Sequence, residues 1–360
     1  MKNKKVLVAM SGGVDSSATA ILLKQRGFEV IGATMQILDA GVGTLNDTNA
    51  INDAKNVCKK LNIPHHILDC RNTFTTRVIN YFKETYNNGQ TPNPCIQCNI
   101  FLKFGELFKF AEELNCDYMA TGHYAKSEFD NKHNTYVIKK AKNTLKDQSY
   151  VLYGINKEKI SKLIFPLGEF ENKEQIREIL VDEGLEILSK KKDSQEICFI
   201  QDNNYGKFLI ENLKLKPKTG NIVDKHGNIL GKHNGLMFYT IGQRKGMGIS
   251  NKTPLYILQL NSEKNEIIVG EESNLYNDEL IAKNCNFLIN LTSQEKLTAK
   301  VRYSAKDAEA IVYKINENTV KVKFIKPQRA ITSGQSVVFY KDDILVGGGI
   351  IAWKMKKDLH

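Results

Sequence analysis

Apolar positions along the first 200 residues follow two alternating patterns. Short apolar runs typical of buried strands alternate with stretches in which apolar residues recur every three or four positions, as in amphipathic helices. This alternation predicts an α/β domain with a parallel sheet covered on both faces, which binds its ligands at the carboxyl ends of the strands. The predicted strands are residues 5–10, 28–35, 65–69 and 117–121, and the predicted helices are residues 16–26, 52–61, 74–87 and 100–114.

The pattern changes after about residue 210. Short alternating runs follow one another, separated by turn segments rich in Asn, Asp and Gly. This predicts mostly antiparallel β structure, with a small central module and then a barrel. We expect an α/β domain over residues 1–205, a central β-rich domain over 206–275 and a C-terminal antiparallel β-barrel over 276–360. The predicted strands are residues 221–224, 236–241, 255–260, 266–269, 299–303, 309–314, 319–324, 336–340 and 344–346.

Composition narrows the class of protein. No stretch of about 18 apolar residues occurs, which excludes a membrane-spanning helix, and the apolar run near the start is too short for a signal peptide. We therefore expect a cytoplasmic protein without a membrane partner. Lys and Arg total 51 against 40 Asp and Glu, so the charge of +11 suits a polyanionic partner, although the lysine bias of an AT-rich genome would also produce it. Seven cysteines in a reducing compartment indicate catalysis or metal binding rather than a disulfide framework.

The first predicted strand leads into the sequence Ser-Gly-Gly-Val-Asp-Ser-Ser at residues 11–17, hereafter the phosphate loop. Two glycines permit a tight turn that aims backbone N–H groups at an anion, and the following helix adds partial positive charge at its N-terminus. The hydroxyls of Ser11, Ser16 and Ser17 add donors, and Asp15 would either hold Mg²⁺ or orient the loop. The lysine of the Walker loop is missing, so we expect the loop to hold pyrophosphate as a leaving group.

Three cysteines stand in settings that favour reactivity. Cys95 and Cys98 lie on a proline-rich loop that opens a predicted helix, and a helix N-terminus lowers the pKa of a thiol. Cys198 follows the basic run at residues 190–192, and nearby lysines also favour the thiolate. These residues indicate sulfur chemistry next to a nucleotide site.

The phosphate loop resembles the signature of the PP-loop ATP pyrophosphatases, which have an adenine nucleotide α-hydrolase-like fold and cleave ATP between its α and β phosphates. With the two cysteine segments, the whole chain is similar to the bacterial tRNA-specific 2-thiouridylase family, whose members sulfurate C2 of the wobble uridine at tRNA position 34. The similar segments are residues 91–104, 120–124, 146–150, 235–246, 301–303 and 330–336.

This resemblance implies a role for each matching residue. Cys98 would be the nucleophile and Cys198 would carry the persulfide, with ATP and Mg²⁺ as cofactors. The implied partners are the tRNAs for Lys, Glu and Gln, and a cysteine desulfurase or sulfur-relay protein as the donor. The implied ATP site is Ala9, Met10, Ser11, Gly12, Gly13, Val14, Asp15, Ser16, Met35 and Gly122. The target-base pocket is Asn93, Pro94 and Cys95; the tRNA contacts are Lys146, Asp147, Gln148, Arg302 and Tyr303; and His123 and Gln335 are further site residues.

Cys95 departs from the family pattern, because many relatives have at this position an Asp that is the proposed acid/base. The ordinary pKa of a thiol is ~8.5, whereas that of Asp is ~3.9, so Cys95 cannot simply replace Asp as the acid/base. Cys95, Cys98 and Cys198 could instead hold a [4Fe–4S] cluster with one open iron. We favour the persulfide route over this alternative and over zinc, for which no fourth ligand is evident. Two other functions are considered. An amide-forming PP-loop synthetase would not need the Cys98–Cys198 pair, and a non-catalytic tRNA-binding protein would tolerate the loss of Asp15 and release no pyrophosphate.

Overall fold

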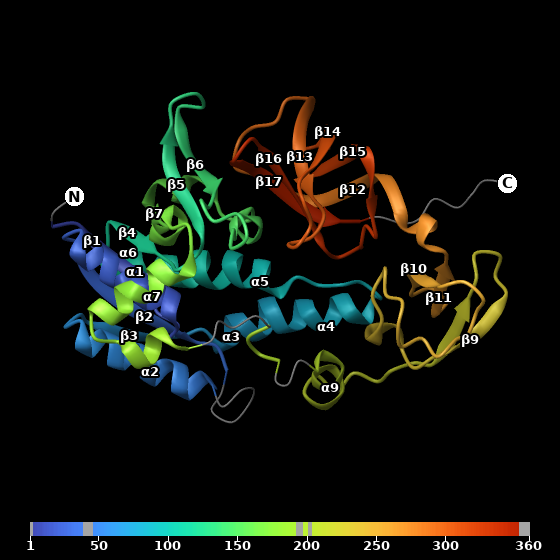
Figure 1. The fold of residues 1–360 in the computed structure, drawn as a ribbon, viewed down its shortest axis with the longest axis horizontal. Helices are drawn as coiled ribbons and strands as arrows, with labels where there is room; N and C mark the ends of the chain where they lie inside the picture. Colours follow the sequence, from blue (N-terminus) through green and yellow to red (C-terminus); the bar gives the residue numbers. More distant parts are fainter. Residues whose placement is uncertain (1–2, 39–45, 192–196, 201–203, 353–360) are drawn as a thin grey trace. The chain divides into compact units, whose positions relative to one another are not determined.

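The computed structural model of the protein describes residues 3–38, 46–191, 197–200 and 204–352 (Figure 1). The chain forms two compact units, each assembled from separate stretches of sequence. Unit 1 comprises residues 1–78, 95–203 and 343–345, and unit 2 comprises residues 79–94, 204–342 and 346–360. None of the helices that the structure describes is long and apolar enough to cross a membrane. The bounds of the three expected domains stay a prediction.

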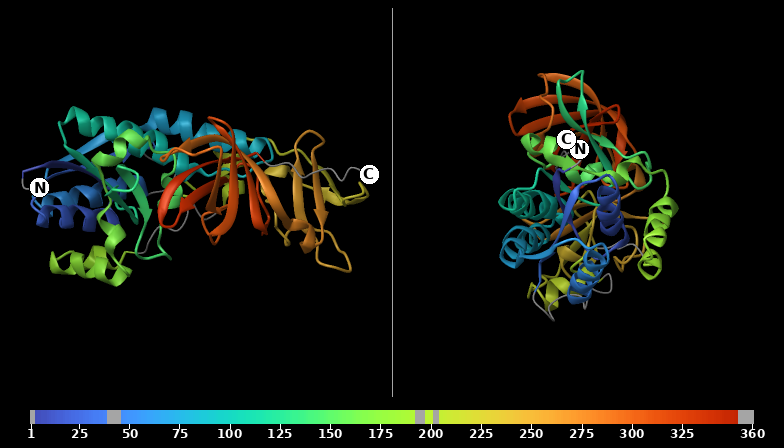
Figure 2. Two further views of the ribbon diagram at one scale, coloured as in Figure 1. Left: turned by 90° about the horizontal axis from the view of Figure 1, so that it is seen from above. Right: turned by 90° about the vertical axis from the view of Figure 1, so that its left-hand side faces the viewer.

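Unit 1 is built on a five-stranded parallel sheet in the order β3-β2-β1-β4-β7. The central strand β1 buries three consecutive apolar residues, Val6, Leu7 and Val8, as expected for a strand covered on both faces. Helices lie on both faces of the sheet (Figure 2). This confirms the predicted α/β class. The strands are β1 (Lys5–Ala9), β2 (Glu29–Gln36), β3 (His65–Asp69), β4 (Tyr118–Ala120) and β7 (Leu163–Ile164).

The helices of unit 1 cover the sheet through apolar faces. Helices α1, α2 and α7 contribute Ala18, Val57 and Ile176 to one core cluster with β1. The helices are α1 (Val14–Gln25), α2 (Asn46–Lys60), α3 (Arg71–Phe74), α6 (Phe108–Glu113), α7 (Lys173–Asp182) and α8 (Glu186–Ser189), with short 3₁₀ turns η3 (Ser149–Leu152), η4 (Lys157–Lys162) and η5 (Pro166–Glu169).

Two predicted helices contain π-helical segments. The predicted helix at 74–87 is a continuous helical stretch of α3, η1 (Thr75–Ile79) and α4 (Asn80–Asn87), in which η1 is a π-helix. The predicted helix at 100–114 starts earlier, with α5 (Pro94–Gln97), and passes through the ten-residue π-helix η2 (Cys98–Leu107) before α6. Because π-helices are rare and often occur at functional sites, η2 marks this segment for attention.

One hairpin of unit 1 was not predicted. Strands β5 (Ala125–Asp130) and β6 (Thr135–Lys140) pair in antiparallel register directly after β4. Their sequence carries few buried apolar residues, with Phe129 and Tyr136 both exposed and in edge contact with each other. The hydrophobic pattern was therefore too weak to predict them.

Unit 2 contains a four-stranded sheet and a closed barrel. The sheet has the order β10-β11-β8-β9, and the barrel has the order β12-β15-β14-β13-β16-β17, closed by pairing of β12 with β17. The predicted C-terminal antiparallel barrel is confirmed. The elements are α9 (Tyr205–Glu211), β8 (Gly220–Val223), β9 (Ile229–His233), η6 (Leu236–Phe238), β10 (Tyr256–Asn261), β11 (Glu266–Gly270), η7 (Glu272–Leu275), β12 (Tyr276–Phe287), β13 (Gln294–Lys300), β14 (Ala308–Asn316), β15 (Thr319–Arg329), β16 (Ser336–Lys341) and β17 (Ile344–Ile351).

Two strand predictions in unit 2 were wrong. Residues 236–241 begin with the 3₁₀ turn η6, and Leu236 and Tyr239, three positions apart, pack into the same core cluster, which a strand of period two would not allow. Residues 301–303 follow the end of β13 and form a turn, so Arg302 and Tyr303 do not lie on a barrel strand.

Candidate functional site

The phosphate loop connects β1 to α1 at the carboxyl edge of the parallel sheet. Gly12 has a φ of +67°, and a Cβ atom there would lie 2.3 Å from the carbonyl oxygen of Ala50. Gly12 is therefore required both by the left-handed backbone and by the close approach of α2. The loop ends at the N-terminus of a 12-residue helix, whose first N–H groups have no partner within the helix.

The serine hydroxyls hold the loop together. Ser16 Oγ and Ser17 Oγ both donate to the carbonyl oxygen of Gly13, at 3.1 and 2.9 Å, and Ser11 N–H donates to Ser16 Oγ at 3.2 Å. Ser17 is fully buried. The hydroxyls of Ser16 and Ser17 are therefore both used inside the loop, and their expected donation to an anion stays a prediction.

Asp15 is fixed by two partners on one carboxylate oxygen. Tyr124 Oη donates to Asp15 Oδ1 at 2.8 Å, and Lys173 Nζ, from the first turn of α7, lies 2.5 Å from the same atom. The Lys173 side chain is only 10% exposed and that of Asp15 is 33% exposed. Of the two roles expected for Asp15, orientation of the loop is the one that these contacts supply.

Two lysines contact the phosphate loop: Lys173, which the sequence did not single out, and Lys191, which belongs to the basic run at residues 190–192. Lys173 binds Asp15 from 158 positions along the chain. Lys191 Nζ donates to the carbonyl oxygen of Gly12 at 3.0 Å and to the Asp53 carboxylate at 2.8 Å. The loop lacks the lysine of a Walker motif, and these two residues bring positive charge to it from distant segments.

Gly122 packs directly on the phosphate loop. A Cβ atom at Gly122 would lie 3.0 Å from the carbonyl carbon of Asp15 and 3.1 Å from the amide nitrogen of Ser16. The segment after β4 therefore needs glycine to approach the loop backbone. This contact places the next residue, His123, beside the loop.

His123 is buried between two partners. Its Nδ1 lies 2.6 Å from Thr121 Oγ1, and its Nε2 lies 3.2 Å from Lys103 Nζ. Burial and the charge of Lys103 lower the pKa of His123 well below its ordinary value, so the ring is neutral at pH 7. The ammonium group can only donate, which assigns Nε2 as the acceptor and leaves the ring proton on Nδ1 to donate to Thr121.

The three candidate cysteines gather in unit 1. Cys95 lies in α5, Cys98 begins η2, and Cys198 precedes Phe199, whose buried ring packs on Phe74 of α3 at 5.5 Å. Cys98 and Cys95 each raise the pKa of Cys198, which shows that the thiols are neighbours. Cys95 and Cys198 reach solvent although protein surrounds them on their other sides.

The expected lowering of the thiol pKa values was wrong. Burial raises the pKa of Cys95 and Cys98, and it raises the pKa of Cys198 to about 12. The loss of hydration destabilises a thiolate here by more than a helix N-terminus stabilises it. The cation that opposes this effect at all three thiols is Lys103, whereas the two described lysines of the basic run, Lys190 and Lys191, do not act on them. Position 192 of that run lies outside the described residues.

The other predicted ATP residues lie at the carboxyl ends of two neighbouring strands. Ala9 ends β1, Met10 N–H donates to a carbonyl of β2 at 2.8 Å, and Val14 begins α1. Met35 is the next-to-last residue of β2 and pairs with β3. Their contacts with ATP stay a prediction.

Of the predicted tRNA contacts in unit 1, two are used inside the protein. The buried Asp147 carboxylate accepts from Ser149 Oγ at 2.7 Å, and Gln148 Oε1 accepts from Tyr124 N–H at 3.0 Å. Gln148 thereby supports the tyrosine that holds Asp15. Lys146 is half-buried in the same loop.

Of the two predicted tRNA contacts in the barrel domain, Arg302 is bonded inside the protein and Tyr303 is exposed. Arg302 Nη2 donates to the carbonyl oxygen of Ala330 at 2.5 Å and to Thr332 Oγ1 at 2.7 Å. Tyr303 is 43% exposed, with Lys300 Nζ 6.0 Å from its ring centroid. Tyr303 therefore presents an aromatic surface, while Arg302 binds the turn after β15.

Gln335 stabilises the loop that precedes the cysteine pair. Its Nε2 donates to the carbonyl oxygens of Thr91 and Pro92, at 3.2 and 3.1 Å. Asn93 N–H donates to the Tyr81 hydroxyl at 3.3 Å. These contacts belong to unit 2 and fix the backbone of the predicted base-pocket segment just before Pro94, the first residue of α5.

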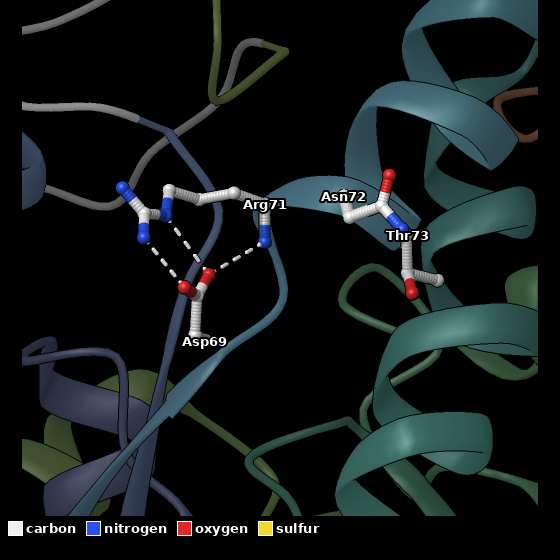
Figure 3. A pocket seen from close by; sticks show the side chains of 4 residues that line it. All are labelled: Asp69, Arg71, Asn72 and Thr73. Atoms are coloured by element: carbon white, nitrogen blue, oxygen red, sulfur yellow. Dashed lines mark hydrogen bonds and ion pairs between the residues drawn. The ribbon is translucent and has the colours of Figure 1, made fainter.

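A separate hollow of about 530 Å³ lies at the carboxyl end of β3 (Figure 3). Asp69, Arg71, Asn72 and Thr73 line it. Arg71 donates to the Asp69 carboxylate at 2.6 Å, and these hydrogen bonds lower the pKa of Asp69 to about 2. The hollow shares no lining residue with the phosphate loop or the three cysteines. Within the described part of the chain, no three His, Cys, Asp or Glu side chains are arranged to hold a metal ion.

Comparison with known proteins connects this geometry to a family. Residues 4–202 match the tRNA methyl transferase HUP domain, residues 206–271 the tRNA methyl transferase PRC-barrel domain, and residues 277–351 the aminomethyltransferase β-barrel domain. The U34-tRNA thiolase NcsA from Methanococcus maripaludis, solved with its [4Fe–4S] cluster, matches at 20% identity over 59% of this chain and 67% of that one, with a TM-score of 0.37. That similarity is too low to support an inference.

Two sequence relatives are similar over nearly their whole length. "tRNA-specific 2-thiouridylase MnmA" of Clostridium kluyveri is 48% identical over 359 residues, covering 97% of this chain and 99% of the relative. "tRNA-specific 2-thiouridylase MnmA 2" of Caldanaerobacter subterraneus is 46% identical over 367 residues, covering 99% and 100%. The chain therefore belongs to the tRNA-specific 2-thiouridylase family.

Proposed function

We propose that the protein is a tRNA-uridine 2-sulfurtransferase that converts the wobble uridine 34 to 2-thiouridine and cleaves ATP to AMP and pyrophosphate. One observation carries this proposal: contacts lead from the phosphate loop to Lys103, whose charge acts on the three thiols. Gly122 packs on Asp15, the adjacent His123 is bonded to Lys103, and Lys103 acts on Cys95, Cys98 and Cys198.

The first step activates the base. The C2 oxygen of uridine attacks the α-phosphorus of ATP, the bond to the bridging oxygen breaks, and pyrophosphate leaves into the phosphate loop. The helix N-terminus of α1 stabilises the negative charge that develops there. Asp15 is the residue that would hold Mg²⁺, which would supply positive charge to neutralise the phosphates of ATP.

The second step transfers sulfur. The outer sulfur of a persulfide on Cys198 attacks C2, and AMP leaves with the former C2 oxygen. The Cys98 thiolate then attacks Cys198 Sγ, and the electron pair of the S–S bond moves to the sulfur on C2, which becomes the thiocarbonyl as N3 regains its proton. A Cys98–Cys198 disulfide remains, and a dithiol reductant reopens it.

A [4Fe–4S] cluster on Cys95, Cys98 and Cys198 is the alternative for the sulfur step. Three thiols suit the chemistry of a cluster with one open iron. The persulfide route needs only two of these thiols, Cys98 and Cys198, and no group beyond the chain's own residues and the sulfur donor. We therefore base the mechanism on the persulfide.

The target uridine must leave its stack in the tRNA to reach the thiols. This costs a few kcal/mol, and a flexible anticodon loop keeps that cost low. We propose the tRNAs for Lys, Glu and Gln as substrates, a cysteine desulfurase or a relay protein as the sulfur donor, and the cytoplasm as the site of action. Tyr303 and Lys146 offer a stacking surface and a charge for the tRNA. Asn93 and Pro94 would contact the target base.

The test is sulfur transfer by anaerobically purified protein. Iron and acid-labile sulfide are measured first, and 2-thiouridine is then measured by mass spectrometry after incubation with unmodified tRNA, ATP and a cysteine desulfurase. We expect iron-free protein to be active, Cys98→Ala and Cys198→Ala to be inactive, and Cys116→Ala, which changes a cysteine outside the site, to keep full activity.

Activity that requires about four irons per chain and all three cysteines would replace the persulfide mechanism by the cluster. ATP cleavage to AMP without thiolation of any of the three tRNAs would refute the proposal that these tRNAs are the substrates.

A further inference from the structure

Cys98 and Lys103 are brought together by an unusual helix. They are the first and sixth residues of η2, in which hydrogen bonds run from residue i to residue i+5. In an α-helix, residues five apart point in different directions, because residues three and four apart share a face. In a π-helix, the residue five positions along returns to the same face one turn later. The geometry of η2 thus places the Lys103 ammonium on the side of the Cys98 thiol.

Lys103 has no carboxylate partner in the part of the chain that the structure describes. Among the residues that the structure describes, no Asp or Glu forms an ion pair with it, whereas Lys173 and Lys191 each have one. Its hydrogen-bond partner at 3.2 Å is His123, a neutral ring. Within the described ranges, the groups on which its charge acts are the thiols of Cys95, Cys98 and Cys198, which can become anionic.

His123 fixes the position of this cation. The ring is buried and is held through Nδ1 by Thr121, in the segment that packs on the phosphate loop. Its Nε2 accepts a hydrogen bond from the Lys103 ammonium group and so fixes the position of that group. Lys103 is half-buried and its hydrogen-bond partner is a neutral ring. The partner does not offset the ammonium charge, so this charge can stabilise a transient anion.

We propose that Lys103 is the charge-compensating residue of the sulfur-transfer step. This inference rests on the proposed function. The negative charge is on Cys98 Sγ when that thiolate attacks Cys198 Sγ, and it is on the sulfur bound to C2 when the S–S bond has broken. Lys103 stabilises the anion at both stages and transfers no atom itself. It acts on the reacting sulfurs through space and is held in place by His123.

The first test separates the two half-reactions in Lys103→Gln. We expect the rate of 2-thiouridine formation to fall by about 10- to 100-fold, as for the loss of one charge-assisted interaction. Single-turnover release of pyrophosphate with tRNA and without a sulfur donor should stay within about twofold of the unmodified protein. Lys103→Arg should restore most of the sulfur transfer, because it restores the charge. Lys109→Gln, which changes an exposed lysine of α6, is the matched control.

The second test does not need tRNA. In a Cys95→Ala, Cys198→Ala background, the alkylation rate of Cys98 by iodoacetamide is measured at one pH. We expect Lys103→Gln to slow alkylation by about tenfold and Lys103→Arg to restore it. Unchanged alkylation, or equal loss of pyrophosphate release and thiolation, would overturn the inference. If the unmodified protein thiolates no tRNA while Lys103 still controls alkylation, the proposed function fails and the role of Lys103 at Cys98 stands.

Discussion

The pairing of Lys173 with Asp15 predicts a measurable loss of stability in Lys173→Met. The substitution keeps the length and apolar stem of the side chain and removes the ammonium group 2.5 Å from Asp15 Oδ1. Removing one partner of a fully buried pair costs about 3–5 kcal/mol. Asp15 keeps 33% exposure of its side chain and the hydrogen bond from Tyr124, so we expect a smaller cost of about 2 kcal/mol.

Thermal unfolding followed by far-UV circular dichroism measures this cost, because most of the long helices belong to unit 1. For a unit of this size, about 2 kcal/mol corresponds to a Tm lower by about 4–8 °C. When Lys173→Met is made in an Asp15→Asn background, the double variant has no unpaired carboxylate. The second substitution should therefore lower the free energy of unfolding by less than about 0.5 kcal/mol.

The matched control is Lys162→Met, which removes an ion pair with Glu112 whose side chains are both 52% exposed. Such a pair is worth less than about 1 kcal/mol, so the Tm should barely change. Equal Tm changes for Lys173→Met and Lys162→Met, or an undiminished effect of Lys173→Met in the Asp15→Asn background, would refute the reasoning.

Three further outcomes follow from the geometry. Gly122→Ala should raise the KM for ATP several-fold in a pyrophosphate-release assay, because its Cβ would lie 3.0 Å from the backbone of Asp15; an unchanged KM would exclude that clash. Arg302→Met should lower the free energy of unfolding in urea by about 1–3 kcal/mol, since the buried carbonyl of Ala330 loses a donor; a loss of tRNA affinity alone would assign Arg302 to tRNA instead. Burial raises the pKa of Cys98, so the thiolate fraction and the thiolation rate should rise from about pH 6.5 to about pH 8.5; a flat profile would argue against a thiolate nucleophile.

The sequence predicted the elements whose burial is strongest. Strand β1 and the closed barrel carry clear apolar patterns, and the structure has both. The hairpin β5–β6 was missed because its side chains face solvent on both sides over much of its length. Residues 236–241 were misassigned because an apolar run alone does not distinguish a strand from a 3₁₀ turn that buries residues three apart.

For the site, motifs located the chemistry but not its electrostatics. The phosphate loop and the cysteines are recognisable as local sequences. The partners of these groups are not, because Lys173 reaches Asp15 through the packing of α7 on the sheet domain, and the effect of Lys103 on Cys98 depends on how the helix that carries both residues is built. The raised pKa values of the thiols also depend on burial, which a sequence motif does not specify.

The segmented build of unit 2 has a consequence for synthesis on the ribosome. Helix α4 packs Phe82 and Tyr86 against Phe208 and Tyr205 of α9, yet more than 100 residues of chain separate the two helices. At a translation rate of ~5–20 residues per second, α9 is synthesised roughly 10 s after α4, and the apolar face of α4 is exposed during this time. Nascent chains halted between these helices should therefore be the species that chaperones capture, and a fragment that begins at residue 204 should aggregate unless α4 is supplied.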